Sequence, residues 1–183
     1  MILDGRPICV LGILDTKKGV EIANAMERWL CRVYDVHEVL HDGTQFELPA
    51  LKEAQRVSME TGKPVLYLHT RGAVNTWDTT EQTHRMWRYV FGYNRYCATI
   101  MNEYTCACVV APFIDNNGTH RYNGFVANTE AWKLANIPDH VEDRHEYEHL
   151  WRNVSGVCQI GVYVQARANK IKEIRKFLKE NFA

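Results

Sequence analysis

The sequence predicts an α/β protein with a mostly parallel central sheet and helices on both faces. Two observations lead to this class. Short, continuously apolar segments such as Ile8–Leu14 (ICVLGIL), typical of strands buried on both sides of a sheet, recur along the chain. Segments with apolar residues at helical spacing, such as residues 17–32, lie between them. Because no repeat or linker interrupts this alternation, we expect a single domain over residues 1–183.

The first half of the chain gives the clearer pattern. We expect strands at residues 8–14, 34–40 and 64–68, and helices at residues 17–32, 49–61 and 80–91. Asp15-Thr16 supplies an N-cap for the first helix, and Gly62 ends the second. The apolar residues of the first helix that we expect on its buried stripe are Val20, Ile22, Ala23, Met26, Trp29 and Leu30.

The second half is less regular, and its elements are predicted from shorter signals. We expect helices at 94–103, 129–136, 141–154 and 169–182, strands at 106–113, 122–127 and 158–165, and a turn at 115–118.

Composition excludes several classes of partner. The chain has 22 Lys+Arg and 22 Asp+Glu, so its zero net charge provides no global attraction to nucleic acid or to an anionic membrane. No apolar run approaches the ~20 residues needed to cross a bilayer, and residues 1–7 do not resemble a signal peptide. We therefore expect a cytoplasmic protein with no transmembrane segment and no nucleic-acid partner.

The six cysteines are expected to be buried free thiols, because a chain of this length does not need a disulfide framework and most of them fall in apolar segments. They are Cys9, Cys31, Cys97, Cys106, Cys108 and Cys158.

The most distinctive polar segment follows the third predicted strand. Ligands of open parallel sheets bind at the carboxyl ends of the strands. There, His69, Thr70, Arg71 and Gly72 place an imidazole, a hydroxyl, a guanidinium and an unhindered backbone in consecutive positions. Arg71 is suited to a bidentate contact with phosphate. The segment indicates an anion-binding site, although a surface loop with one incidental basic residue would have the same composition.

Two other features are ligand candidates. Asp15 and Thr16 follow the first strand, where nucleotide-binding folds often hold a base or phosphate, but an N-cap explains the same pair. The glycine spacing there is not that of a Walker loop. Trp77 lies in the polar loop and is the tryptophan best placed to stack on a sugar ring.

The segment 65–72 (VLYLHTRG) resembles the LYxHTKG signature of a bacterial group of glycosyltransferase-like proteins related to the rhamnan-synthesis glycosyltransferases. Arg71 stands where the signature has lysine. The similarity spans residues 62–151, and the later motifs keep their order along the chain. These motifs are Trp87-Arg88, His120 with Asn123-Gly124-Phe125, and Arg144 with Glu148. Val126-Ala127 stands where an aromatic pair usually follows the phenylalanine.

The resemblance implies a nucleotide-sugar-transferase-like (GT-A-like) fold and a role in polysaccharide biosynthesis. The reaction would be hexosyl or deoxyhexosyl transfer from a nucleotide-sugar donor to a glycan acceptor. The chain has no Asp-x-Asp metal motif, so we expect Arg71 and His69 to neutralise the departing diphosphate. A divalent metal is compatible with this mechanism but not required. Because 183 residues are few for a transferase, a homo-oligomer in which a second copy completes the acceptor contacts also stays open.

The expected residues fall into two groups. The candidate catalytic residues are His69, Arg71, Asp115 and Glu148, with Asp78 and Glu130 as further general-base candidates. The candidate donor and acceptor contacts are Asp15, Thr16, Thr70, Gly72, Trp77, Arg88, His120, Asn123, Gly124, Phe125 and Arg144.

Two alternatives belong to other functional classes. The absent Asp-x-Asp motif and aromatic pair favour a non-catalytic nucleotide- or glycan-binding domain of the same fold. The second alternative is a zinc peptidase, because residues 145–149 (HEYEH) match H-E-x-x-H. On an α-helix this spacing places His145 and His149 on one face. No histidine follows His149, which leaves Glu173 or Glu180 as the third ligand.

Overall fold

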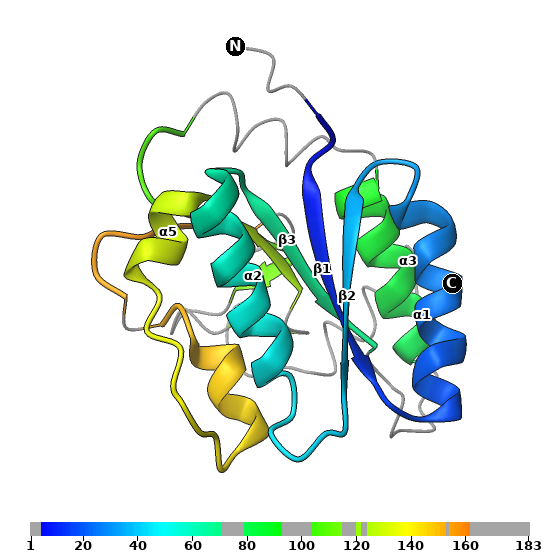
Figure 1. Cartoon of the computed structure of the whole chain (residues 1–183). Helices are drawn as coiled ribbons and strands as arrows, with labels where there is room; N and C mark the ends of the chain where they lie inside the picture. Colours follow the sequence, from blue (N-terminus) through cyan, green and yellow to red (C-terminus); the bar gives the residue numbers. More distant parts are fainter. Residues whose placement is uncertain are drawn as a thin grey trace.

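The computed structural model describes residues 5–70, 79–92, 104–114, 120–121, 124–152 and 154–161. Within these residues six strands form one mixed sheet with the order β2-β1-β3-β7-β4-β8. Figure 1 labels its first three neighbours, β2, β1 and β3. Only β7 runs against its neighbours β3 and β4. The strands are β1 (Ile8–Leu14), β2 (Asp35–His41), β3 (Val65–His69), β4 (Cys108–Ala111), β7 (Phe125–Ala127) and β8 (Cys158–Gly161). The prediction of a mostly parallel α/β sheet is confirmed.

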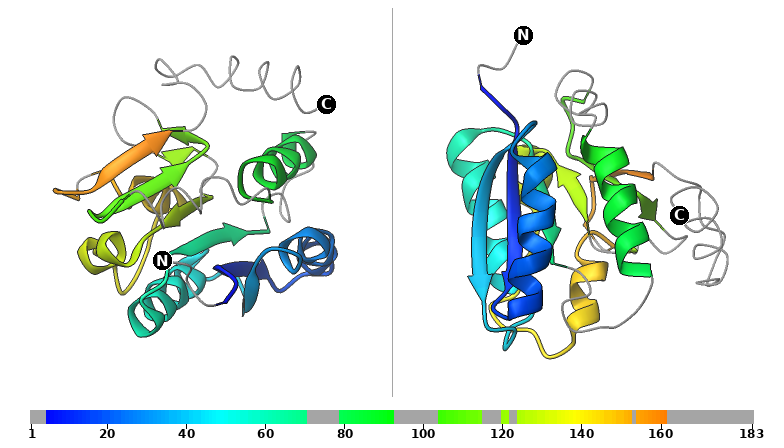
Figure 2. Two further views of the ribbon diagram at one scale, coloured as in Figure 1. Left: turned by 90° about the horizontal axis from the view of Figure 1, so that it is seen from above. Right: turned by 90° about the vertical axis from the view of Figure 1, so that its right-hand side faces the viewer.

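Helices cover both faces of this sheet (Figure 2). Helices α1 (Lys17–Leu30) and α3 (Thr79–Gly92) pack on one face, where their apolar residues join Leu66 and Leu68 in one core cluster. Helices α2 (Leu48–Thr61) and α5 (Thr129–Leu134) pack on the other face with Val65 and Tyr67. None of the helices described is long and apolar enough to span a membrane.

The local signals of the first half act as predicted. The Thr16 hydroxyl caps α1 by accepting a hydrogen bond from the Gly19 N–H at 3.0 Å. Helix α2 ends at Thr61 and is capped by Gly62, whose φ of +68° favours glycine. One residue of the predicted α1 stripe is misplaced, because Val20 is 42% exposed. The helix ends at Leu30, two residues earlier than predicted.

The second half departs further from expectation. The strand predicted at 106–113 is split at Pro112 into β4 and β5 (Phe113–Ile114), since proline has no N–H to donate to a ladder. Strand β5 instead pairs with β6 (His120–Arg121) in a separate two-stranded sheet. The helix predicted at 141–154 is a short 3₁₀ helix, η1 (Arg144–His149). The predictions at 94–103, 115–118 and 169–182 lie outside the described residues.

The cysteine prediction is half right. All five described cysteines are free thiols, and Cys9 and Cys108 are buried as expected. Cys31, Cys106 and Cys158 are exposed, which corrects the expectation of burial. Cys97 lies outside the described part of the chain.

Candidate functional site

Polar groups from several loops gather at the carboxyl ends of the parallel strands, at the lower edge of the sheet in Figure 1. The loops that follow β1 and β2 meet there, and the chain leaves β3 at Thr70. Strand β7 runs the opposite way, so Gly124, just before its first residue, lies at the same edge. This is the edge at which open α/β sheets bind ligands.

The end of β3 is held firmly against β1. The Thr70 N–H donates to the Gly12 carbonyl oxygen at 2.9 Å, and the Leu14 N–H donates to Thr70 Oγ1 at 3.0 Å. A Cβ on Gly12 would come within 2.9 Å of the Ala50 side chain, so the absence of a side chain at this position lets α2 pack close to β1. His69 and Thr70 are consequently fixed in place and each only 6% exposed.

Glu47, at the start of α2, forms an ion-pair contact with the predicted site residue His69. The distance between His69 Nε2 and Glu47 Oε1 is 3.9 Å, and both side chains are largely withdrawn from solvent. The Trp87 ring meets the imidazole edge-on, with 5.7 Å between ring centroids. The pair places an imidazole and a carboxylate, which can exchange protons, at the carboxyl end of β3.

Two tyrosines lie close to the same carboxylate. Burial raises the pKa of Tyr67 well above its ordinary value, and the negative charge of Glu47 raises it further. The Tyr147 pKa is raised for the same two reasons, burial first and Glu47 second. Both phenols are therefore neutral hydroxyls at physiological pH.

Gln45 joins η1 to the loop that carries Glu47. The Tyr147 hydroxyl donates to the Gln45 carbonyl oxygen at 2.7 Å, and the Val141 N–H donates to Gln45 Oε1 at 3.2 Å. Phe46, between Gln45 and Glu47, has φ +49°, and no other non-glycine residue of the described chain has a positive φ. The backbone is thus held in a sparsely populated conformation where it positions Glu47.

The remaining predicted residues, which lie in or next to β1, α3 and β7, have diverse environments. Thr16 caps α1, and Asp15 beside it is exposed. Arg88 is exposed on α3. A Cβ on Gly124 would lie 2.6 Å from Trp87 Nε1, so this glycine allows a close approach of the two segments. Phe125 is fully buried, and its ring packs against Tyr67, Trp132 and Trp151.

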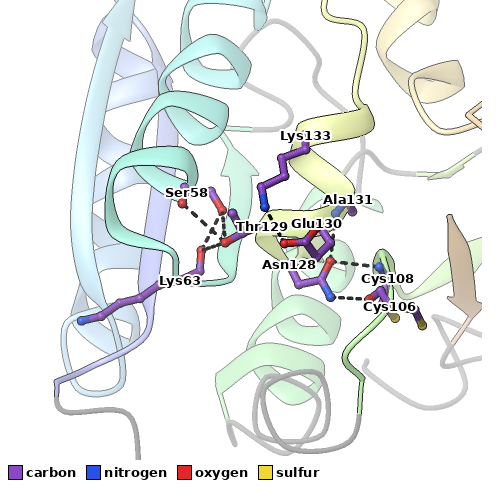
Figure 3. Close-up of polar contacts among 9 residues, drawn as sticks. All are labelled: Ser58, Lys63, Cys106, Cys108, Asn128, Thr129, Glu130, Ala131 and Lys133. Carbon is purple, nitrogen blue, oxygen red and sulfur yellow. Dashed lines mark hydrogen bonds and ion pairs between the residues drawn. The ribbon is translucent and has the colours of Figure 1, made fainter. Parts of the chain in front are cut away.

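The later motifs reach the same edge through η1 and β6. Strand β6, which contains His120, packs beside η1, which contains Arg144 and Glu148. Glu130 lies instead on α5 at the opposite edge, where its carboxylate pairs with Lys133 Nζ at 2.6 Å (Figure 3). The predicted residues that fall outside the described residues are Arg71, Gly72, Trp77, Asp78, Asp115 and Asn123.

The zinc alternative depends on an α-helix that this segment does not form. Residues 145–149 lie in a 3₁₀ helix, in which positions four apart are separated by about 120° around the axis instead of about 40°. Among the described residues no group of three His, Cys, Asp or Glu side chains could hold a metal ion. The zinc site therefore stays a prediction without support from the helix geometry.

Sequence reasoning missed Glu47, Tyr67 and Tyr147. Glu47 was recoverable in principle, because it precedes a helix that follows a parallel strand, and such loops lie at the carboxyl edge. Tyr67 lies within the strand predicted at residues 64–68, and the apolar pattern of that strand does not indicate a nearby carboxylate. The position of Tyr147 depends on the path of residues 136–149 back across α2, and no local pattern encodes that path.

The fold and the site together define an α/β protein with an open, mostly parallel sheet and a partly buried His–Glu pair at its carboxyl edge. Among known proteins, no family model, no curated protein and no solved structure matches the chain.

Proposed function

We propose that the protein is a glycosyltransferase-like enzyme that transfers a sugar from a nucleotide-activated donor to a glycan or other acceptor. The observation that carries this proposal is the position of His69 and Thr70, locked to β1 at the carboxyl end of β3 with Glu47 3.9 Å from the imidazole. Arg71 and Gly72, the last two residues of the LYxHTKG-like segment, follow Thr70 directly in the sequence. The GT-A-like form of the fold belongs to the same proposal, and the mostly parallel sheet supports it.

The proposed chemistry is stabilisation of a departing diphosphate by fixed cationic and hydrogen-bonding groups. Arg71 would supply the permanent charge, and His69, two residues earlier in the sequence, would add a hydrogen-bond donor. The Glu47 carboxylate, 3.9 Å from His69 Nε2, balances positive charge on the imidazole when the ring is protonated. Since the chain has no Asp-x-Asp motif, this arrangement replaces the metal that would otherwise neutralise the leaving group.

Binding is tested by calorimetric titration of the full chain with UDP-glucose, GDP-mannose and dTDP-rhamnose, each with and without Mg²⁺. We expect one of these probes to bind without the metal. Arg71→Ala and His69→Gln should each weaken that binding by about tenfold or more, which corresponds to about 1.4 kcal/mol. His37→Gln is the matched control, because His37 is a partly exposed histidine on β2 rather than a residue of this edge.

Catalysis is tested separately, by measuring release of the nucleoside diphosphate in the presence of glycan acceptors. Release that fails in His69→Gln and Glu47→Gln but persists in His37→Gln supports the enzyme. Binding without release identifies the non-catalytic binding domain instead. If no nucleotide sugar binds, or if Arg71→Ala changes neither affinity nor turnover, the proposed function is wrong.

A further inference from the structure

Two cysteines are paired at the amino ends of β4 and β8, at the edge of the sheet opposite the candidate site. Cys108 of β4 lies directly across from Cys158 of β8 in the parallel ladder. Both are free thiols in the structure, Cys108 buried and Cys158 exposed. A third free cysteine, Cys106, lies two residues before Cys108 and is exposed.

The side chains of Cys108 and Cys158 share one face of the sheet. Cys108 and Val110 belong to the core cluster beneath α1 and α3, and Ile160, the ladder partner of Val110, packs against that cluster. Side chains alternate along a strand, so Cys158 lies on the same face as Ile160. The proximity of Cys158 also contributes, after burial, to the raised pKa of Cys108. The two cysteine side chains are therefore neighbours on that face of the sheet.

The backbone around Cys108 is fixed on both sides. Asn128 Oδ1 accepts a hydrogen bond from the Cys108 N–H at 2.9 Å, and its Nδ2 donates to the Cys106 carbonyl oxygen at 2.7 Å (Figure 3). On the other side, the Cys158 N–H donates to the Ala107 carbonyl oxygen at 2.8 Å. Neighbouring strands lie about 4.8 Å apart, within the Cα separation of about 4.4–6.8 Å that a disulfide spans. The register of Cys108 and Cys158 therefore gives the pair a Cα separation that a disulfide can span.

From this geometry we propose that Cys108 and Cys158 form a reversible cross-strand disulfide by exchange with a small-molecule disulfide such as oxidised glutathione. The alternative use of clustered thiols, metal binding, is not supported, because no described group of three potential ligands could hold a metal ion. Cys31 provides a contrast within the same chain. It is also exposed and free, but it lies at the end of α1, away from the cluster.

The exchange has two steps. The exposed Cys158 thiolate attacks one sulfur of oxidised glutathione, which forms a mixed disulfide and releases one glutathione thiolate. Cys108 then loses its proton and attacks Cys158 Sγ, which breaks the mixed disulfide and releases the second glutathione. Two protein thiols are oxidised, and one glutathione disulfide is reduced to two thiols. Burial raises the pKa of Cys108 to about 12, so the second step should be the slower one.

The test is a peptide map of the full, folded chain after incubation in reduced and oxidised glutathione, quenched with acid and alkylated. We expect a Cys108–Cys158 linked peptide that has lost two hydrogen atoms, and glutathione alone on Cys31. Dithiothreitol should remove the link. Cys158→Ser should abolish it, whereas Cys31→Ser and Cys106→Ser should retain it.

Two results overturn the proposal. In the first, Cys158 accumulates only as a mixed disulfide with glutathione, as we expect of Cys31. The other is a link that joins Cys106 to Cys158 and leaves Cys108 free for alkylation. The map of the unsubstituted chain decides between these outcomes, so the test does not depend on the folding of any variant. It is also independent of the proposed sugar transfer, because the thiol pair and the His–Glu pair lie at opposite edges of the sheet.

Discussion

Asn128→Ala should be among the most damaging single substitutions in the second half of the chain. Asn128 is buried, with only 7% of the residue exposed. Its Oδ1 accepts from the Ala131 N–H at 3.0 Å, which caps α5, and from the buried Cys108 N–H at 2.9 Å. Loss of an N-cap costs about 1 kcal/mol, and a buried donor left without a partner costs about 2 kcal/mol.

We therefore expect Asn128→Ala to lower the free energy of unfolding by about 3 kcal/mol, measured by urea titration at neutral pH. For a chain of this size the thermal midpoint should fall by about 6–12 °C. Asn136→Ala, in the exposed segment after α5, is the matched control and should stay within about 0.5 kcal/mol of the parent. An Asn128→Ala protein with an unchanged m-value and a loss below about 0.5 kcal/mol would refute the reasoning.

Three further predictions concern packing and pH. Gly124→Ala should lower the free energy of unfolding by about 1–3 kcal/mol in urea titration, because the added Cβ would lie 2.6 Å from Trp87 Nε1. Gly161→Ala is the control and should be nearly neutral, because its Cβ would meet nothing closer than 3.8 Å. Burial lowers the pKa of His41 below 6.5, so the unfolded chain takes up a proton at His41 more readily than the folded protein does. The free energy of unfolding is therefore unaffected by His41 above about pH 6.5 and decreases as the pH falls. His41→Gln should then lose less stability than the parent between about pH 7 and 5, and equal losses would contradict the assignment. Burial raises the pKa of Tyr67, so stability is lost as the pH rises above about 10, and Tyr67→Phe should lose less there in the same titration.

The fold was largely predictable where each element carries its own local signal. The apolar segment of β1, the Thr16 cap and Gly62 specify strands and helices from adjacent residues alone. The position of β7 is not specified in this way. It has only three residues, Phe125–Ala127, and its place between β3 and β4 depends on packing between segments far apart in the chain.

The site was predictable as a location but not as a set of contacts. Parallel strands bring their carboxyl ends together, so His69 and Thr70 were expected at a ligand-binding edge. Which groups meet His69 depends on the turn between β2 and α2, where Phe46 adopts φ +49° against its usual preference. Sequence patterns are poor at predicting such a conformation. The contact between Glu47 and His69 was missed for this reason, although the location of Glu47 at this edge was recoverable.

The central place of β7 also determines the order in which the sheet can be completed. Strands β1 to β3 lie within residues 8–69, whereas β4 and β8 lie within residues 108–161, and β7 is the strand that joins the two groups. Until residues 125–127 insert, β3 and β4 each present an open edge, which in a partly folded chain invites pairing with another molecule. Aggregation during refolding should therefore be sensitive to changes in this three-residue strand, out of proportion to its length.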